Sequence, residues 1–187
     1  DQAIVIRDAG GAPQLGIAAV CEAGAEALAA RYAGVKDRLE AALSGSEAPR
    51  IALGRRKALE ACGAAAAQAP LSVMGGGWDY AALGGRLEAA EAGERARFSG
   101  SPVPAGFCEA EALPEVTLVT LGRHGEKPVL ESVPVPVREP LISIGGDLDG
   151  LEAAIERTGR ESPGALLQAT YTGVTEQPDL AERLEAL

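Results

Sequence analysis

The sequence has 187 residues, of which 47% are hydrophobic, so it is long and apolar enough for at least one domain with a buried core. Its formal net charge is −10 and it has no dense run of Lys and Arg. That balance argues against DNA binding by this chain alone, because phosphate neutralisation supplies most non-specific affinity.

No apolar run approaches the roughly 20 residues of a membrane span, and no signal peptide is recognisable. The sequence therefore predicts a cytoplasmic protein with no membrane association. Cys21, Cys62 and Cys108 have no C-x-x-C spacing, and we expect reduced, buried thiols. The one histidine, His124, lies in a predicted turn. We interpret it as a solvent-exposed residue, because a zinc site or a Cys–His pair needs further partners.

The N-terminal part predicts two strands, a long helix and a third strand. Residues 3–6 and 16–20 are short apolar strands around a Gly10-Gly11 turn, the pattern of a hairpin. Residues 22–44 form a helix, since one face repeats apolar side chains at helical spacing. That face consists of Leu28, Tyr32, Val35 and Leu39. Residues 50–53 form the third strand.

The middle of the chain is mixed. Residues 57–69 are rich in Ala and favour a helix that ends at Pro70. Residues 75–77 are three glycines, which we interpret as a plain linker, the alternative being a loop that cradles a ligand. Residues 79–83 are a core strand, and the charged segment 88–97 is a solvated turn.

The sequence from 97 to 137 predicts strands and tight turns. Residues 97–102 are a strand end that turns sharply at Gly100, because glycine permits a backbone conformation that strains other residues. Ser99 and Ser101 in this turn could bind a phosphate, or could satisfy the turn's own backbone. Residues 116–121, with Val116 and Leu118 facing inward, pair antiparallel with residues 129–137.

After residue 139 the pattern changes to strand, helix, strand, helix. Residues 141–144 are a strand, and Asp149 begins a capping box that opens a helix to about Thr158. Residues 165–171 are the next strand, and a terminal helix begins at Pro178. We therefore expect two domains, residues 1–139 and 140–187.

Several motifs between residues 78 and 138 follow one another in a distinctive order and spacing. They are Trp78-Asp79-Tyr80-Ala81-Ala82-Leu83-Gly84, Arg97-Phe98-Ser99-Gly100-Ser101-Pro102, Phe107-Cys108-Glu109-Ala110, the strand at 116–121, and Val133-Pro134-Val135-Pro136-Val137-Arg138. Together they resemble the SbcD family, the nuclease component of a bacterial DNA-repair complex. The resemblance implies an α/β (α+β) fold: the C-terminal part of a metallophosphoesterase-like sandwich, followed by a small strand-helix-strand-helix cap.

Such phosphoesterases hold two divalent metals, typically manganese, which clamp the attacking and leaving oxygens of a phosphodiester. Three of the family's ligand motifs would precede residue 1. A lone His maps onto Arg55, and the family's G-H-x-H reads Gly84-Gly85-Arg86-Leu87, so the histidine positions hold Gly85 and Leu87. None of these side chains ligates such a metal. We expect no catalytic residue, no metal ligand and no cofactor in this chain.

Three interpretations remain open. The chain is a piece or degenerate relative of an SbcD protein, inactive by itself, or it is an interaction domain of SbcD-like ancestry with no role in DNA cleavage. In the third, it is an enzyme whose ligands come from elsewhere. Candidate partners are an SbcC-type coiled-coil ATPase, DNA within a complex, and a second copy of the chain. The candidate phosphate or DNA contacts are Arg55, Arg86, Arg97, Ser99 and Ser101.

Overall fold

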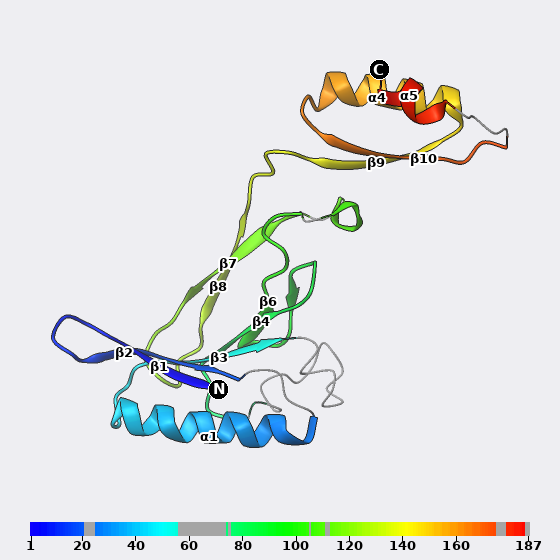
Figure 1. The fold of residues 1–187 in the computed structure, drawn as a ribbon. Coiled ribbons are helices and arrows are strands. Elements are labelled where there is room, and N and C mark those ends of the chain that lie inside the picture. The colour runs from blue at the N-terminus through cyan, green and yellow to red at the C-terminus, as the bar shows by residue number, and fades with distance from the viewer. Residues whose placement is uncertain are drawn as a thin grey trace. The chain divides into compact units, whose positions relative to one another are not determined.

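The computed structural model describes residues 1–20, 25–55, 74, 76–104, 106–110, 113–174 and 179–185. Strands and helices are mixed along the chain, so the expected α+β class is confirmed. The chain divides into two compact units, one of Asp1–Pro102 with Glu115–Pro134, the other of Val103–Pro114 with Val135–Leu187. Figure 1 shows the elements of each unit. The domain boundary at residue 139 stays a prediction.

The first unit is built on a six-stranded sheet in the order β1-β2-β3-β4-β6-β5. Its strands are β1 (Gln2–Arg7), β2 (Pro13–Ala19), β3 (Arg50–Arg55), β4 (Tyr80–Gly84), β5 (Ala90–Glu91) and β6 (Ala96–Phe98). β1 and β2 form the predicted antiparallel hairpin. β2, β3, β4 and β6 run parallel to one another, so their carboxyl ends meet at one edge.

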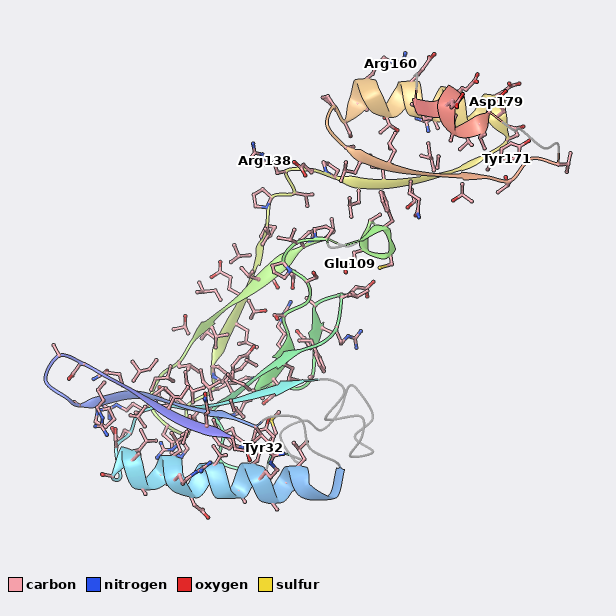
Figure 2. The ribbon with its side chains drawn as sticks, in the orientation of Figure 1. Tyr32, Glu109, Arg138, Arg160, Tyr171 and Asp179 are labelled. Carbon is pink, nitrogen blue, oxygen red and sulfur yellow. The ribbon has the colours of Figure 1, made fainter. Side chains whose placement is uncertain are left out.

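Helix α1 (Ala25–Leu43) packs along one face of this sheet against β1 and β2 (Figure 1). The predicted apolar face is confirmed, because the side chains at helical spacing are nearly inaccessible to solvent. They are Leu28, Tyr32, Val35, Leu39 and Leu43. Tyr32 reaches from α1 to the sheet (Figure 2), where its hydroxyl donates to the Leu53 carbonyl. Desolvation raises the pKa of this phenol to about 12.

The segment 88–97 differs from the predicted solvated turn. It contains β5 and the start of β6, and its small side chains Ala92 and Ala96 are buried in the core. Its charged residues alternate with these alanines, which hides the strand pattern. Gly100 has φ of 75°, so the predicted sharp turn after β6 is confirmed.

Strands β7 (Glu115–Thr120) and β8 (Val129–Pro134) pair antiparallel as predicted. The predicted inward face is wrong, because Val116 and Leu118 are 41% and 55% exposed. The alternate residues, such as Glu115 and Thr117, are half-buried instead. The reason is Arg97 on β6, which draws the polar face of β7 inward through a hydrogen bond to Glu115.

The second unit pairs β9 (Leu141–Gly146) parallel to β10 (Leu166–Tyr171), with α4 (Leu148–Glu161) between them in sequence and packed on both. A short helix α5 (Leu180–Glu185) follows, and a single 3₁₀ turn, η1 (Phe107–Glu109), contacts β9. The strand-helix-strand-helix order is as predicted. The predicted cap is wrong, because Asp147 and not Asp149 caps α4, accepting from the backbone N–H of Gly150 at 3.0 Å.

The predictions for the three cysteines and for the helix at 57–69 fall only partly on described residues. Cys108 is exposed, contrary to the expectation of a buried thiol, because it lies on the one-turn η1. Cys21, Cys62 and the predicted helix at 57–69 lie outside the described residues.

In the part of the chain that the structure describes, no helix combines the length and apolar character needed to cross a membrane.

Candidate functional site

Two of the positions that the resemblance assigns to metal ligands, Arg55 and Gly85, lie at one edge of the sheet. Arg55 ends β3 and pairs in register with Gly84, the last residue of β4. Gly85 follows directly, and the backbone N–H of Ser99 donates to the Leu83 carbonyl on the same edge. This is the carboxyl edge of three parallel strands, where open α/β sheets usually bind their ligands.

The side chains at this edge do not fit a divalent metal. Gly85, with φ of 90°, has no side chain, and Leu87 presents carbon atoms only. The Arg86 guanidinium lies over the Phe98 ring, 5.6 Å from its centroid, and is itself a cation. Among residues 1–20, 25–55, 74, 76–104, 106–110, 113–174 and 179–185, no three His, Cys, Asp or Glu side chains gather as metal ligands.

Arg97 is held by internal partners. Its Nη2 donates to Glu115 Oε1 at 2.5 Å and to Ser132 Oγ at 2.6 Å. The Ser132 hydroxyl also donates to Glu115 Oε1, which closes a small network between β6 and the β7–β8 pair. The Arg97 side chain is only 15% exposed. A phosphate at Arg97 would therefore compete with Glu115 for the guanidinium.

The two predicted serines lie in the turn after β6. Ser99 is exposed, and Ser101 is half-buried with its backbone N–H donating to the Leu87 carbonyl at 2.8 Å. This bond satisfies a turn donor within the chain, as one of the two sequence interpretations expects. The phosphate-contact interpretation of both serines stays a prediction.

A second polar cluster lies at the opposite end of β4, around the buried carboxylate of Asp79, which is 2% exposed. Its Oδ2 accepts from His124 Nδ1 at 2.8 Å and from the Arg50 backbone N–H at 2.7 Å. Its Oδ1 accepts from the Gly125 backbone N–H at 2.7 Å, with Arg95 Nη1 3.7 Å away. The carboxylate therefore fastens the turn between β7 and β8 to the start of β4.

Opposing effects act on the pKa of Asp79. Burial disfavours the charged form and raises the pKa, while hydrogen bonds from His124, Gly125 and Arg50 stabilise it. The hydrogen bonds outweigh the burial, so the pKa of Asp79 lies below its ordinary value. The carboxylate is ionised at neutral pH and can only accept hydrogen bonds. The His124 ring consequently carries its proton on Nδ1, and Nε2 takes no part in the bond to Asp79.

Arg50 joins the cluster to α1. Its side chain is 5% exposed, and its Nε and Nη2 each donate to one carboxylate oxygen of Glu40 at 2.7 Å. This bidentate hydrogen bond lowers the pKa of Glu40. The pair links the last turns of α1 to β3, next to the Asp79 carboxylate.

Sequence reasoning did not find the Asp79 cluster. Asp79 and His124 are separated by 45 positions, and neither lies in a recognised motif spacing. His124 is in the predicted turn, with 37% of its side chain exposed, but it is bonded to a buried carboxylate. The available signals were an aspartate before an apolar strand and a lone histidine in a Gly-Arg-His-Gly turn, and neither signal predicts a contact with the other residue.

The fold and the first edge together define an α+β protein in which parallel strands end at one edge of the sheet. The sequence matches no family model. It is similar to the SbcD component of the SbcCD nuclease of Escherichia coli K12, with 33% identity over 113 residues, and equally to that of Escherichia coli O157:H7. The match covers 58% of this chain and 28% of each relative. This chain thus shares a stretch with a nuclease component and spans under a third of its length.

Proposed function

We propose that this chain is an SbcD-like component of a DNA-repair complex that does not cleave DNA by itself. The observation that carries the proposal is the edge formed by β3 and β4. Arg55 pairs with Gly84 at this edge, and the resemblance maps the family's histidines onto Arg55, Gly85 and Leu87. Two-metal cleavage needs several carboxylate and imidazole ligands around ions about 4 Å apart, and these residues supply none.

The partner we propose is an SbcC-type coiled-coil ATPase, with DNA bound in the complex. Exposed apolar side chains support a protein partner, among them Val116, Leu118 and Val133 on one face of the β7–β8 pair. Similarity to a protein named as part of the SbcCD nuclease supports the same partner class. A second copy of the chain is the competing occupant of such a surface.

The alternative function is a protein-interaction domain with no role in DNA cleavage. The acidic net charge of −10 and the pairing of Arg97 with Glu115 favour it, because both reduce the attraction for phosphate. Co-purification separates the two functions. Specific capture of an SbcC-type ATPase supports the repair complex, whereas capture of the chain by other proteins alone supports the alternative.

The inactivity is tested by titrating the 187-residue chain with manganese in a calorimeter and by assaying release of nucleotides from linear duplex DNA at low salt. We expect no stoichiometric binding heat and no metal-dependent release. The SbcCD nuclease of Escherichia coli, assayed in parallel, is the positive control. Saturable manganese binding together with metal-dependent release by this chain would overturn the proposal.

A further inference from the structure

The turn that Asp79 fastens also borders an open cleft of about 440 Å³. The cleft is lined by Gly76, Gly77, Trp78, Asp79, Arg95, His124 and Gly125. All of these belong to the first unit, and the cleft lies at the end of β4 remote from Arg55 and Gly85. It is therefore distinct from the edge that the resemblance identifies.

Cationic and donor groups form part of this cleft and its rim, although the chain as a whole is acidic. Arg95 is 29% exposed, and its Nη1 and Nη2 donate to the carbonyls of Glu126 and Gly125, both at 2.8 Å. These bonds fix the guanidinium plane. Lys36 places its ammonium on the Gly76 carbonyl, with the Trp78 ring centroid 5.9 Å away. Asp79 contributes negative charge, but its carboxylate is buried beneath its donors.

His124 adds a ring that is held in one orientation and whose side chain is 37% exposed. Its Nδ1 is committed to Asp79 Oδ2, which sets both the tautomer and the direction of the ring. Nε2 can accept a hydrogen bond from a ligand, such as the hydroxyl of a hydrogen phosphate.

The backbone at the cleft includes a glycine in a left-handed conformation. Gly77 has φ of 88°, and a Cβ at this position would lie 2.5 Å from the Lys36 ammonium nitrogen. A side chain here would be strained and would displace the lysine. Glycine at position 77 thus allows the Lys36 ammonium to lie at the rim of the cleft.

We propose that this cleft binds a phosphate group, held by the Arg95 guanidinium, His124 Nε2 and the Lys36 ammonium. Fastening the β7–β8 turn explains the bonds of Asp79, but it does not explain why the Arg95 and Lys36 cations meet at the same cleft. The phosphate could be free or could belong to a nucleic-acid end, since both present the same oxygens. The proposal does not depend on the proposed role in a repair complex.

The chain has one histidine and one tryptophan, and both line the cleft, so each is a site-specific probe. The experiment follows the His124 ring resonances and the Trp78 emission of the whole chain during titration with inorganic phosphate. Parallel titrations use a short 5′-phosphorylated single strand and the same strand without the phosphate. We expect saturation with inorganic phosphate or with the phosphorylated strand, and none with the unphosphorylated strand.

Two variants test the named groups. His124→Asn retains a donor for Asp79 but removes Nε2, and Arg95→Gln removes the guanidinium. Each should weaken phosphate binding about tenfold, the usual effect of losing a charge-assisted hydrogen bond. Arg123→Gln is the matched control, because Arg123 is on the same turn, is 74% exposed and pairs with Glu47 outside the cleft. It should leave the affinity unchanged.

Retention of the unfolding transition shows that a variant is folded, and if His124→Asn fails this check then Arg95→Gln alone decides. Inorganic phosphate alone saturating the signals identifies free phosphate as the ligand, whereas the phosphorylated strand alone identifies a nucleic-acid end. Linear, unsaturated shifts in every titration would overturn the proposal. Equal binding by wild type and both folded variants would do the same, and would leave the cluster as a structural fastening only.

Discussion

Asp79 shows how one buried carboxylate can organise residues from distant parts of the chain. Its donors are the Arg50 backbone on β3 and the His124-Gly125 turn between β7 and β8. A buried charge is tolerated only when such donors compensate for the lost water. The same carboxylate therefore contributes to stability and gives His124 a fixed orientation.

We predict that Asp79→Asn lowers the free energy of unfolding of the first unit by about 2–4 kcal/mol at pH 7. An amide has one acceptor oxygen where the carboxylate uses two, so at least one buried donor loses its partner. Urea unfolding followed by Trp78 fluorescence measures the change, because Trp78 lies in the same core. Asp149→Asn, in the first turn of α4 in the other unit, is the control and should not shift this transition.

The wild type and the Asp79→Asn variant also test how the free energy of unfolding depends on pH. The pKa values of Asp79 and Glu40 are lowered in the folded state. Their stabilisation is thus fully present above the unfolded pKa values and is lost as pH falls through the folded ones. The unfolding free energy of the wild type should decline in acid, and Asp79→Asn should decline less steeply. Equal slopes for both proteins would show that Asp79 does not contribute.

At the scale of single elements, the turn after β6 depends on a glycine. Gly100 has φ of 75°, and an added Cβ would lie 2.7 Å from the backbone nitrogen of Ala89. Both the backbone conformation and the close approach exclude a side chain. This turn sets where the chain leaves the sheet, beside the candidate edge at Gly85.

We predict that Gly100→Ala destabilises the first unit by about 1–3 kcal/mol, because strain of this size accompanies a disfavoured backbone. Gly34→Ala is the matched control, since Gly34 lies within α1 and an added Cβ meets no atom within 4 Å. This control should stabilise by up to about 1 kcal/mol, the difference in helix propensity. Thermal unfolding of both variants measures the effects, and a Gly100→Ala protein as stable as wild type would contradict the prediction.

Elements with a strong local pattern were predictable from the sequence. The α1 face and the β1–β2 hairpin needed only apolar spacing and a glycine turn. The burial of β7 was not predictable, because Arg97 and Glu115 decide which face turns inward. The sequence pattern puts the cap of α4 at Asp149, two residues late, because Asp147 and Asp149 both suit an N-cap and only the backbone geometry separates them.

Part of the candidate site could likewise be predicted from the sequence, and part could not. Motif spacing identified Arg55, Gly85 and Leu87, and the strand register brings Arg55 beside Gly84. The Asp79–His124 pair could not be found, because its partners come from β4 and from the distant β7–β8 turn. Contacts formed by tertiary packing leave no periodic trace in the sequence.

At the scale of the whole molecule, the two units have separate cores. The first core gathers α1 and the six-stranded sheet around side chains such as Leu39 and Phe98. In the second unit, Leu151 is fully buried where α4 packs on β9 and β10. Each unit thus has its own buried apolar side chains, which is what independent folding requires.

We predict that the two units unfold in separate transitions. Leu151→Ala should destabilise the second unit by about 2–5 kcal/mol, the usual effect of a core cavity. It should shift part of the far-ultraviolet circular dichroism transition and leave the Trp78 fluorescence transition in place. Leu39→Ala is the reciprocal control, because Leu39 is fully buried against the first sheet. It should shift the Trp78 transition instead. If both variants move both signals together, the chain unfolds as one cooperative unit and the proposed division into domains is wrong.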